Sequence, residues 1–579
     1  MSFLGVETSL TGRRWIGPDV ELTRAAELLV QRAGLPDPVC QVLARRGVVD
    51  TQAAGFLAPA LRDLLPDPRS LRDMEAAATR FLSALQNRER IAIFADYDVD
   101  GGSSAALLLV WLRDMGHRAT LYIPDRIDEG YGPNDEAMSA LAAEHDLIVC
   151  VDCGTLSHGP IAAAKGADVI VLDHHLGGET LPDALAVVNP NRQDEDGTLA
   201  HLCAAAVVFL MLVEVGRQLR EAGRKGPDLM TMLDLVALAT VADVAPLTGV
   251  NRAFVRQGLK VMARRARPGL AALSDVARMD TAPTAYHLGF LLGPRINAGG
   301  RIGQADLGAR LLATADPHEA AALAERLDQL NTDRREVEAA VRASAMAQAE
   351  ERGFDGPLAW AAGPGWHPGV VGIVASRLKE AANRPSIVIG VEDGIGKGSG
   401  RSISGIDLGA PIQRLAAEGL LIKGGGHKMA AGLTVAEDKI DAAMARLGEL
   451  LTKQGAHLAG PADLNLCGMM MPGAATVELA EMVDQAGPFG AGAPAPRYAF
   501  ADMQIRFAKR VGENHLKVSF GDGLGANLEA ISFGAYDGPL GPALENHGGA
   551  RFHLAGRLDI NNFRGRRTVQ LRLEDAARA

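Results

Sequence analysis

The stretch from Ile91 to Gly101 constrains the fold and function of this chain more than any other. It starts with the apolar run Ile-Ala-Ile-Phe-Ala and continues as Asp96-Tyr-Asp98-Val-Asp100-Gly. The apolar run predicts a buried strand of a parallel sheet. If the acidic run stays extended, its three carboxylates point the same way, and a divalent cation is the usual partner of such a cluster. Taken alone, these residues fit a solvated acidic turn equally well.

Two later apolar runs, residues 146–151 and 168–172, are also followed by Asp or His, which are common metal ligands. A further acidic residue follows the run 233–242, which is long and rich in Ala and Leu and therefore predicts a helix. Short buried strands separated by helical stretches predict a parallel α/β sheet, and such sheets place their sites at the carboxyl ends of the strands. Acidic strand ends combined with two adjacent histidines favour a metal site. The polar residues in question are Asp152, Asp173, His174, His175 and Asp243.

The four motifs, in this order, resemble those of the DHH phosphoesterase superfamily. They read Asp-Tyr-Asp-Val-Asp-Gly at 96–101, Val-Asp-Cys-Gly at 151–154, Asp-His-His at 173–175 and Val-Ala-Asp-Val at 241–244. Chain length and the flanking segments resemble the RecJ branch of this superfamily, the single-stranded-DNA-specific 5′→3′ exonucleases. The resemblance implies hydrolysis of single-stranded DNA to 5′-mononucleotides in DNA repair and recombination, by a two-metal mechanism.

The same resemblance implies a role for each catalytic residue. The implied metal ligands are Asp98 for one metal, Asp100, His174 and Asp243 for the other, Asp152 between the two, and Asp96 as a further ligand or a group that orients one. His175 is expected to face the scissile phosphate. Some branches of the superfamily place a His four residues before Asp98, where this chain has Phe94, so one metal is expected to bind more loosely. Mixed imidazole and carboxylate donors favour Mn²⁺ over Ca²⁺, with Mg²⁺ as a substitute.

Glycine-rich segments at 293–301, 397–402 and 424–428 are predicted to be loops that bind phosphate, because each carries basic or polar residues beside its glycines. Residues 101–104 are predicted to be a turn that starts a helix, whose N-terminus would hold an anion beside the metals. The resemblance to RecJ and to the DHH-associated domain implies the substrate-binding residues. They are Arg295, Asn297 and Arg301 for a phosphate, Ser399 and Arg401 for a terminal phosphate, and Gly425, Gly426 and His427 for the strand near the scissile phosphate.

The expected fold is α/β, with a DHH-type parallel-sheet catalytic domain joined by a long helix to a smaller α/β DHH-associated domain, and a C-terminal β-barrel of the OB-fold. The helix is predicted because residues from 317 to 352 show apolar side chains at helical spacing and almost no Gly or Pro. The expected parts are a helical segment at 1–70 packed on the domain that follows, the catalytic domain at 71–316, the helix at 317–352, the DHH-associated substrate-binding domain at 353–452 and the barrel at 460–579. Arg557, Arg564, Arg566 and Arg567 are expected to give the barrel a DNA-binding face.

The formal net charge of −11 argues weakly against a nucleic-acid partner, although an average over the chain does not exclude a local basic groove. The longest apolar runs are shorter than the roughly 20 residues of a membrane helix, and the first residues lack a signal core. Five scattered cysteines suit a reducing compartment. We therefore expect a cytoplasmic protein without membrane contact. The family resemblance implies that it acts on single-stranded DNA as a monomer and meets a single-stranded-DNA-binding protein and a helicase.

Two other functions fit the same motifs. One is a DHH phosphodiesterase acting on short oligoribonucleotides or cyclic dinucleotides, and the other is a non-catalytic DHH scaffold in a replication complex. The expected barrel and the basic segments favour a long strand over a dinucleotide. Every motif position that binds metal is filled, which favours an enzyme over a scaffold.

Overall fold

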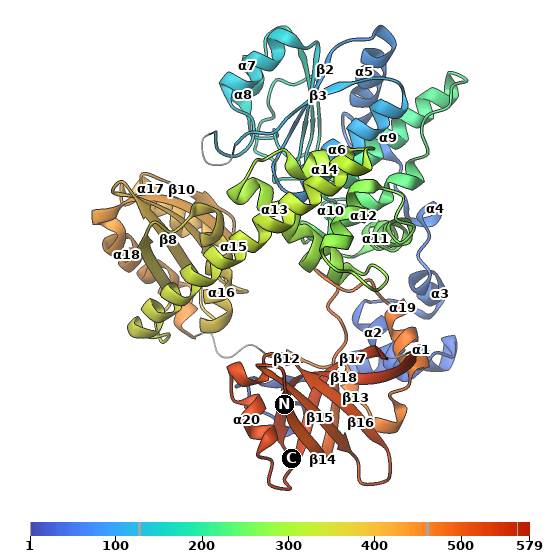
Figure 1. Ribbon diagram of the computed structural model, residues 1–579, viewed down its shortest axis with the longest axis vertical. Helices are drawn as coiled ribbons and strands as arrows, with labels where there is room; N and C mark the ends of the chain where they lie inside the picture. Colours follow the sequence, from blue (N-terminus) through green and yellow to red (C-terminus); the bar gives the residue numbers. More distant parts are fainter. Residues whose placement is uncertain (1, 126–128, 459–462, 564) are drawn as a thin grey trace. The chain divides into compact units, whose positions relative to one another are not determined.

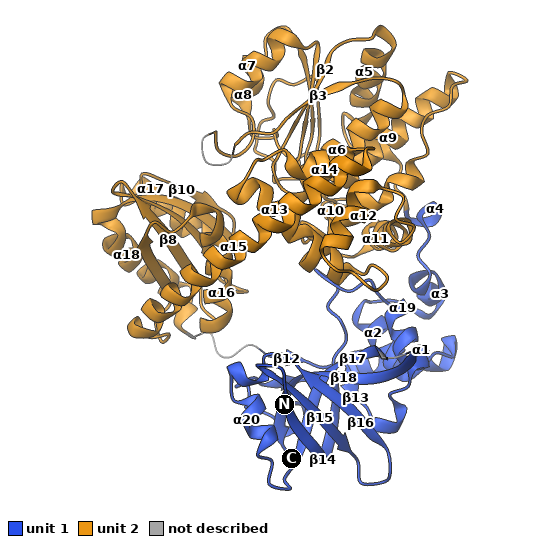
Figure 2. Cartoon of the chain, viewed as in Figure 1, with its two compact units in different colours: residues 1–64, 461–579 blue, residues 65–460 orange. Residues whose placement is uncertain are grey.

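The computed structural model describes residues 2–125, 129–458, 463–563 and 565–579. They form two compact units, which Figure 2 shows in different colours. Residues 65–460 make the larger unit, and residues 1–64 together with 461–579 make the smaller one. All residues expected to bind metal or to carry out catalysis lie in the larger unit.

A five-stranded parallel sheet is the centre of one part of the larger unit, the parallel-sheet part. Its inner strands are short apolar runs with nearly every side chain buried, as expected for a parallel sheet covered on both faces. The predicted strands after residues 90, 146 and 167 are confirmed. The edge strands β3 and β6 were not predicted, because one is half-exposed and the other has only three residues. In spatial order the strands are β3 (Ala119–Tyr122), β2 (Ile91–Ala95), β4 (Leu147–Val151), β5 (Asp168–Leu172) and β6 (Ala186–Val188).

Helices cover both faces of this sheet (Figure 1). On one face, α7 and α8 share a core with Phe94, Cys150 and Val171 of the strands. On the other face, α5, α6 and α9 pack against one another and against the sheet. This arrangement leaves the carboxyl edge of the strands open for a site. The helices are α5 (Met74–Asn87), α6 (Val99–Asp114), α7 (Asp135–Glu144), α8 (His158–Ala163) and α9 (Ala204–Glu221).

Helix α6 starts earlier than predicted. Asp98 is its N-cap residue, and the Asp98 Oδ1 atom accepts hydrogen bonds from the backbone N–H groups of Asp100 (2.8 Å) and Gly101 (3.2 Å). Residues 101–104, predicted as a turn, lie inside the helix. Gly101 permits this close packing, because a Cβ there would lie 2.4 Å from the carbonyl oxygen of Asp96. The acidic run is therefore not extended, and Asp100 projects from a helix.

The predicted glycine-rich loop at 293–301 is wrong, because these residues form helix α13 (Gly293–Ile302). Its glycines serve close packing between elements. A Cβ at Gly300 would lie 2.7 Å from the ring of Tyr97, and one at Gly303, the C-cap residue directly after the helix, would lie 2.6 Å from a methyl carbon of Leu330. Helices α10 (Leu233–Ala242), α11 (Gly249–Met262), α12 (Pro268–Val276) and α14 (Leu307–Ala313) and the π-helical segment η4 (His287–Leu292) complete this part of the unit.

The long connecting helix is confirmed as α15 (Pro317–Arg352). With 36 residues, it is about 54 Å long at the usual rise per residue. Its first half contacts α12, α13 and α14, and its second half contacts α16 and β7. The helix therefore connects the parallel-sheet part to a second part of the same unit, the mixed-sheet part (residues 353–452) (Figure 1).

The mixed-sheet part is a five-stranded sheet in the order β10-β11-β9-β8-β7. The predicted loops at 397–402 and 424–428 are mainly strands here, so that prediction was wrong. In β9 the glycines face the core, where a Cβ at Gly398 would lie 2.9 Å from Ile389 and one at Gly400 would lie 2.6 Å from Ile387. Side chains alternate along a strand, so Ser399 points to the opposite face. The elements are β7 (Ala359–Pro364), α16 (Pro368–Ala382), β8 (Ser386–Glu392), β9 (Ile395–Arg401), α17 (Gly409–Ala417), β10 (Lys423–Gly426), β11 (Ala430–Ala436) and α18 (Ile440–Lys453).

The smaller unit contains the predicted β-barrel. Its strands follow the order β13-β14-β15-β16-β18-β17, and β14 also pairs with β17, which closes the sheet. Strands at 515, 528, 551 and 568 were predicted, whereas β14, the longest of them, was not. The elements are β13 (Gly468–Met469), α19 (Val477–Gln485), β14 (Tyr498–Val511), β15 (His515–Gly521), β16 (Asn527–Ser532), α20 (Leu540–Glu545), β17 (Arg551–Phe563) and β18 (Arg566–Arg578).

The N-terminal helices belong to this barrel unit. Leu29 and Leu43 share one hydrophobic core with Phe500 and Leu554 of the barrel strands. The expectation that these helices pack on the domain following them was therefore wrong, because their apolar faces meet strands more than 400 residues away in sequence. The helices are α1 (Val20–Ala33), α2 (Asp37–Arg45), α3 (Asp50–Leu57) and α4 (Leu61–Leu64).

Candidate metal centre

The predicted ligands converge at the carboxyl edge of the parallel sheet. Three groups of side chains each offer ligand atoms that all lie within 4.8 Å of one another. Asp152 is shared by two of the groups, and His174 is also shared by two. The groups are Asp96, Asp98 and Asp152; Asp100, His174 and Asp243; and Asp152, His174 and His175.

His174 lies among three carboxylates. Its Nε2 atom is 3.3 Å from Asp152 Oδ1 and 3.7 Å from Asp100 Oδ2, and its Nδ1 atom is 3.8 Å from Asp243 Oδ2. These carboxylates come from β4, α6 and α10, so the sheet edge and two helices together place them. A ring surrounded by acidic oxygens at these distances suits a shared cation.

Asp100 is fixed by the N-terminus of α9. Its Oδ2 accepts a hydrogen bond from the N–H of Ala204 (2.7 Å), and its Oδ1 accepts one from Ala205 (2.8 Å). Burial raises the pKa of Asp100, whereas the charge of His174 and these N–H groups oppose that rise. The helix end thus stabilises the carboxylate in one orientation.

The N-terminus of α6 is already satisfied within the protein. Asp98 accepts from two of its N–H groups, and Asn297 Oδ1 accepts from the N–H of Val99 (3.1 Å). The expectation that this helix end binds an anion was therefore wrong, because its donors are already hydrogen-bonded.

Asp152 combines backbone strain with a buried carboxylate. Its φ of 60° lies in the left-handed region, which residues other than glycine adopt rarely, although Asp tolerates it better than most. Among the described residues, no group donates a hydrogen bond to Asp152 Oδ1, although the residue is only 2% exposed. A buried carboxylate oxygen without a donor is costly unless a cation binds it. The donor set therefore fits a divalent metal.

Burial and mutual repulsion keep protons on this cluster. Burial, followed by the charges of Asp100, Asp98 and Asp96, raises the pKa of Asp152 well above its usual value. Burial and the charges of Asp100 and Asp98 raise the pKa of Asp243 to about 8. Cations bound here must displace these protons.

His175 is held by two residues outside the predicted site set. Its Nδ1 lies 2.8 Å from Asp173 Oδ1, and the Tyr131 hydroxyl lies 3.0 Å from its Nε2. Burial disfavours the charged ring, but the hydrogen bond and charge of Asp173 outweigh it and raise the pKa of His175 to about 9. Asp173 is itself fixed, because its Oδ2 accepts hydrogen bonds from the N–H and hydroxyl of Thr155. The position of Asp173 inside the Asp-His-His motif was the available sequence signal, and Tyr131 had none.

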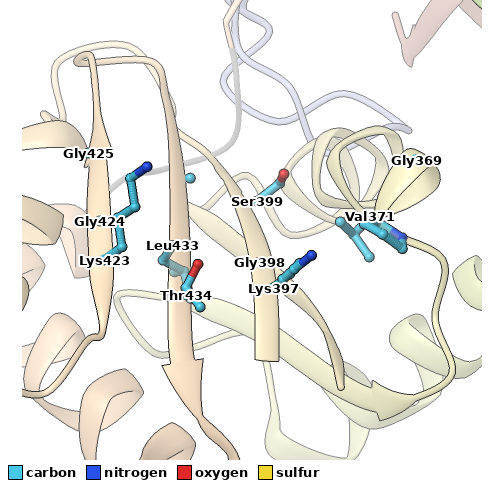
Figure 3. Close-up of a pocket in the computed structure, with 12 residues that line it drawn as sticks. Gly369, Val371, Lys397, Gly398, Ser399, Lys423, Gly424, Gly425, Leu433 and Thr434 are labelled. Carbon is cyan, nitrogen blue, oxygen red and sulfur yellow. The ribbon is translucent and has the colours of Figure 1, made fainter. Parts of the chain in front are cut away.

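The mixed-sheet part contains a pocket of about 510 Å³ (Figure 3). Strands β9, β10 and β11 form its floor, and the start of α16 forms its rim. Ser399 and Gly425, both predicted, line this pocket together with Lys397 and Lys423, which were not predicted. Two ammonium groups beside glycine backbone suit a phosphate.

The other predicted substrate residues have protein contacts near this region. Arg401 Nη2 and Ser399 Oγ lie 3.2 and 3.4 Å from where a Cβ at Gly372 of α16 would be. Arg301 donates from Nη1 to the carbonyl oxygen of Gly369, a residue of the pocket rim (2.9 Å). Gly426, with φ of 148°, precedes His427, whose backbone N–H bonds to the carbonyl of Ala430.

Arg295 forms an ion pair and Asn297 forms a hydrogen bond with residues around the parallel-sheet part. Arg295 Nε lies 2.8 Å from Asp328 Oδ1 of α15, and Asn297 holds the start of α6. Phosphate binding by these two residues stays a prediction.

The predicted basic face of the barrel is partly neutralised. Arg557 forms an ion pair with Glu574, and Arg567 forms one with Glu481. Arg564 lies outside the described residues. Within the described ranges, no helix is long and apolar enough to cross a membrane.

Three family models match the chain. The DHH family N-terminal domain matches residues 90–240, the DHHA1 domain matches 355–453, and the RecJ OB domain matches 468–575. These ranges fall on the parallel sheet, the pocket-bearing sheet and the barrel.

Proteins of known identity are similar over nearly the whole chain. The single-stranded-DNA-specific exonuclease RecJ of Dickeya dadantii is 41% identical over 93% of this chain and 96% of its own length. The protein of that name from Escherichia coli is 38% identical over 94% and 96%. The structure of RecJ in complex with Mn²⁺ from Thermus thermophilus has a TM-score of 0.79 and 29% identity, covering 97% of this chain and 79% of that one.

Proposed function

The chain belongs to the RecJ family of single-stranded-DNA-specific exonucleases, and from that premise we propose that it digests single-stranded DNA from the 5′ end to 5′-mononucleotides with two divalent metal ions. The observation that carries this proposal is the convergence of acidic and imidazole ligands around Asp152 and His174. The RecJ structures that resemble this chain are described in complex with Mn²⁺ and with Mg²⁺.

The ligand groups assign two positions. Asp96 and Asp98 would hold one cation, Asp100 and Asp243 with His174 would hold the other, and Asp152 would belong to both. Bound divalent cations activate water and offset the negative charge that develops on the phosphate. Nitrogen and oxygen donors together favour Mn²⁺, with Mg²⁺ as a substitute.

His175 would act on the substrate directly. In the metal-free protein, its pKa of about 9 favours the protonated ring, chiefly through the hydrogen bond and charge of Asp173. A protonated ring can donate to a non-bridging oxygen of the scissile phosphate or to the leaving oxygen. Asp173 and Tyr131 hold the ring in place, which lowers the entropic cost of that contact.

The 5′ end would bind in the pocket of the mixed-sheet part, which would then be the substrate-binding part. Ser399 and Arg401, with the ammonium groups of Lys397 and Lys423, would hold the terminal phosphate, and the backbone at Gly425, Gly426 and His427 would contact the strand near the scissile bond. The hydrogen bond from Arg301 to Gly369 supports this, since it brings α13 of the parallel-sheet part to the rim of that pocket. The direction of digestion would be 5′ to 3′ because this pocket would accept the 5′ end of the strand.

Family membership favours this function over the two alternatives. The RecJ OB domain gives the chain a further part that a dinucleotide hydrolase does not need. A scaffold would not need a complete ligand set. We further propose a cytoplasmic monomer that meets a single-stranded-DNA-binding protein and a helicase, as the family resemblance implies.

The test uses long strands labelled at either end, with Mn²⁺. A 5′-labelled single strand should release labelled mononucleotide at once, whereas a 3′-labelled strand should release its label last and a blunt duplex should persist. Cleavage restricted to oligomers of a few nucleotides, or early release of the 3′ label, would contradict the proposal.

A further inference from the structure

Two aromatic rings lie stacked on the surface of the parallel-sheet part. The ring centroids of Tyr286 and Phe290 are 5.1 Å apart, and the ring planes meet at 25°. Tyr286 is 52% exposed and Phe290 is 68% exposed. Large apolar side chains exposed as a pair are unusual on a protein surface and mark a binding site more often than isolated ones do.

The segment that carries Phe290 packs on the helix that ends at a metal ligand. Gly289, next to Phe290 in the chain, packs on the last turn of α10, where a Cβ would lie 3.4 Å from Val241. Gly293 packs on Ala242 of the same turn at the same distance. Asp243, a member of the metal-ligand groups, is the C-cap residue of α10. The rings therefore project from a segment that touches the helix end carrying a metal ligand.

The backbone that carries Phe290 has an unusual geometry, and its neighbouring leucines fill the core. The segment η4 is π-helical, a rare geometry that occurs frequently at functional sites. Leu288 and Leu292 of this segment are fully buried, so the core is filled without Tyr286 and Phe290. Val244, directly after Asp243, is also 68% exposed and has a φ of 60°, which is strained for a β-branched residue. Val244 thus adds exposed apolar surface directly after the metal ligand.

We propose that Tyr286 and Phe290 form a stacking platform for unpaired bases of the DNA strand whose phosphate lies in the metal centre. This inference rests on the proposed function and adds a residue-level source of single-strand preference. Base faces are accessible only when a strand is unpaired, and stacking on aromatic rings accepts every base. A duplex buries those faces and gains nothing from this platform.

The experiment combines protein variants with strands that lack one base. Full-length protein without metal is titrated with a single strand carrying an abasic position that is moved stepwise from the 5′ end. In the wild type, loss of the base at one or two positions should weaken binding by about tenfold, the usual size of one base–aromatic stack. In the double variant Tyr286→Ala/Phe290→Ala, the intact strand should bind about tenfold more weakly and the abasic position should have no further effect.

A strand with 2-aminopurine at the sensitive position gives an independent signal. Its fluorescence should be quenched by the wild type and by Phe290→Tyr, which keeps a ring, but not by the double variant. Leu185→Ala is the matched control, because Leu185 is an exposed apolar residue at the amino end of the strands, directly before β6, and should leave binding unchanged. Melting temperatures show that each variant is folded.

The inference is overturned if the double variant binds the intact strand as the wild type does, or if the abasic penalty persists in it. The proposed function is tested separately, because wild-type digestion of a long strand with Mn²⁺ does not depend on these variants. If the wild type digests the strand and the double variant binds it as tightly as the wild type does, the stacking platform is rejected and the proposed function is not.

Discussion

Asp173 Oδ1 lies 2.8 Å from Nδ1 of His175 and also accepts hydrogen bonds from the backbone N–H groups of His174 and His175. One buried carboxylate therefore fixes both the position and the charge of the second histidine in the Asp-His-His motif. Asp173 lies outside the metal-ligand groups, so its effect on the reaction can be separated from metal binding.

Replacing Asp173 with Asn should lower kcat by about 100-fold, the lower range for a lost general acid. Asp173 is what keeps the pKa of His175 raised to about 9, so the variant should lose activity at a lower alkaline pH than the wild type. The measurement is kcat/KM from pH 6 to 10, with Mn²⁺ affinity followed in parallel. Asp168→Asn, at the opposite end of β5, is the control. An unchanged alkaline limb would show that His175 does not act as a protonated group.

Mn²⁺ should bind more tightly as pH rises from about 6 to 8.5, with release of protons. The raised pKa values of Asp152 and Asp243 mean that the folded, metal-free protein holds protons that the unfolded chain has already lost at these pH values. Metal-free stability should therefore fall as pH rises from about 4 through 8, and Mn²⁺ should raise the melting temperature more at pH 8 than at pH 6.

Calorimetric titration in buffers of different ionisation enthalpy counts the released protons. Asp243→Asn, which cannot titrate, should release fewer of them. Metal binding that is independent of pH would contradict the assignment.

Asn297→Ala should destabilise the larger unit by about 1–3 kcal/mol, because it leaves the buried N–H of Val99 without its acceptor. Chemical denaturation of the full chain measures the loss. Asn297→Asp keeps an acceptor oxygen and should lose less stability. If both variants unfold as the wild type does, Asn297 does not hold the start of α6 in solution.

Ser399→Ala should reduce the preference for a 5′-phosphorylated strand over a 5′-hydroxyl strand. The Ser399 side chain lines the pocket that also contains Lys397 and Lys423, where a terminal phosphate would gain charge-assisted hydrogen bonds. Rates on the two strands, measured at low substrate concentration, give the preference directly. Thr434→Val, which removes a hydroxyl from the same pocket, tests whether any such loss has this effect. An unchanged ratio in Ser399→Ala would place the terminal phosphate elsewhere.

The sequence predicted the parts of the fold whose patterns are local. The runs at 91–95, 147–151 and 168–172 are apolar throughout because both faces of the sheet are covered, and helix α15 has an uninterrupted helical pattern. The glycine-rich stretches were wrongly predicted to be loops, because glycine occurs both in loops and in closely packed helices and strands. Gly300 is required by Tyr97, which is distant in sequence, and Gly398 is required by Ile389 on the neighbouring strand.

The site was predictable as far as motif residues allowed. The motifs predicted a shared set of metal ligands, and these residues lie close together in the ligand groups. They are Asp98, Asp100, Asp152, His174 and Asp243. Contacts made by distant elements were not predictable, such as Tyr131 on His175 and the N–H groups of α9 on Asp100. They depend on how helices are placed over the sheet, which no local pattern encodes.

The most direct test of the account removes the shared carboxylate. Full-length Asp152→Asn keeps the size of the side chain but not its charge, and it is compared with the wild type on a 5′-labelled single strand with Mn²⁺. We predict that the variant binds the strand but releases no labelled mononucleotide, and that it binds less Mn²⁺ than the wild type. Digestion by the variant at the wild-type rate would contradict a metal centre built around Asp152.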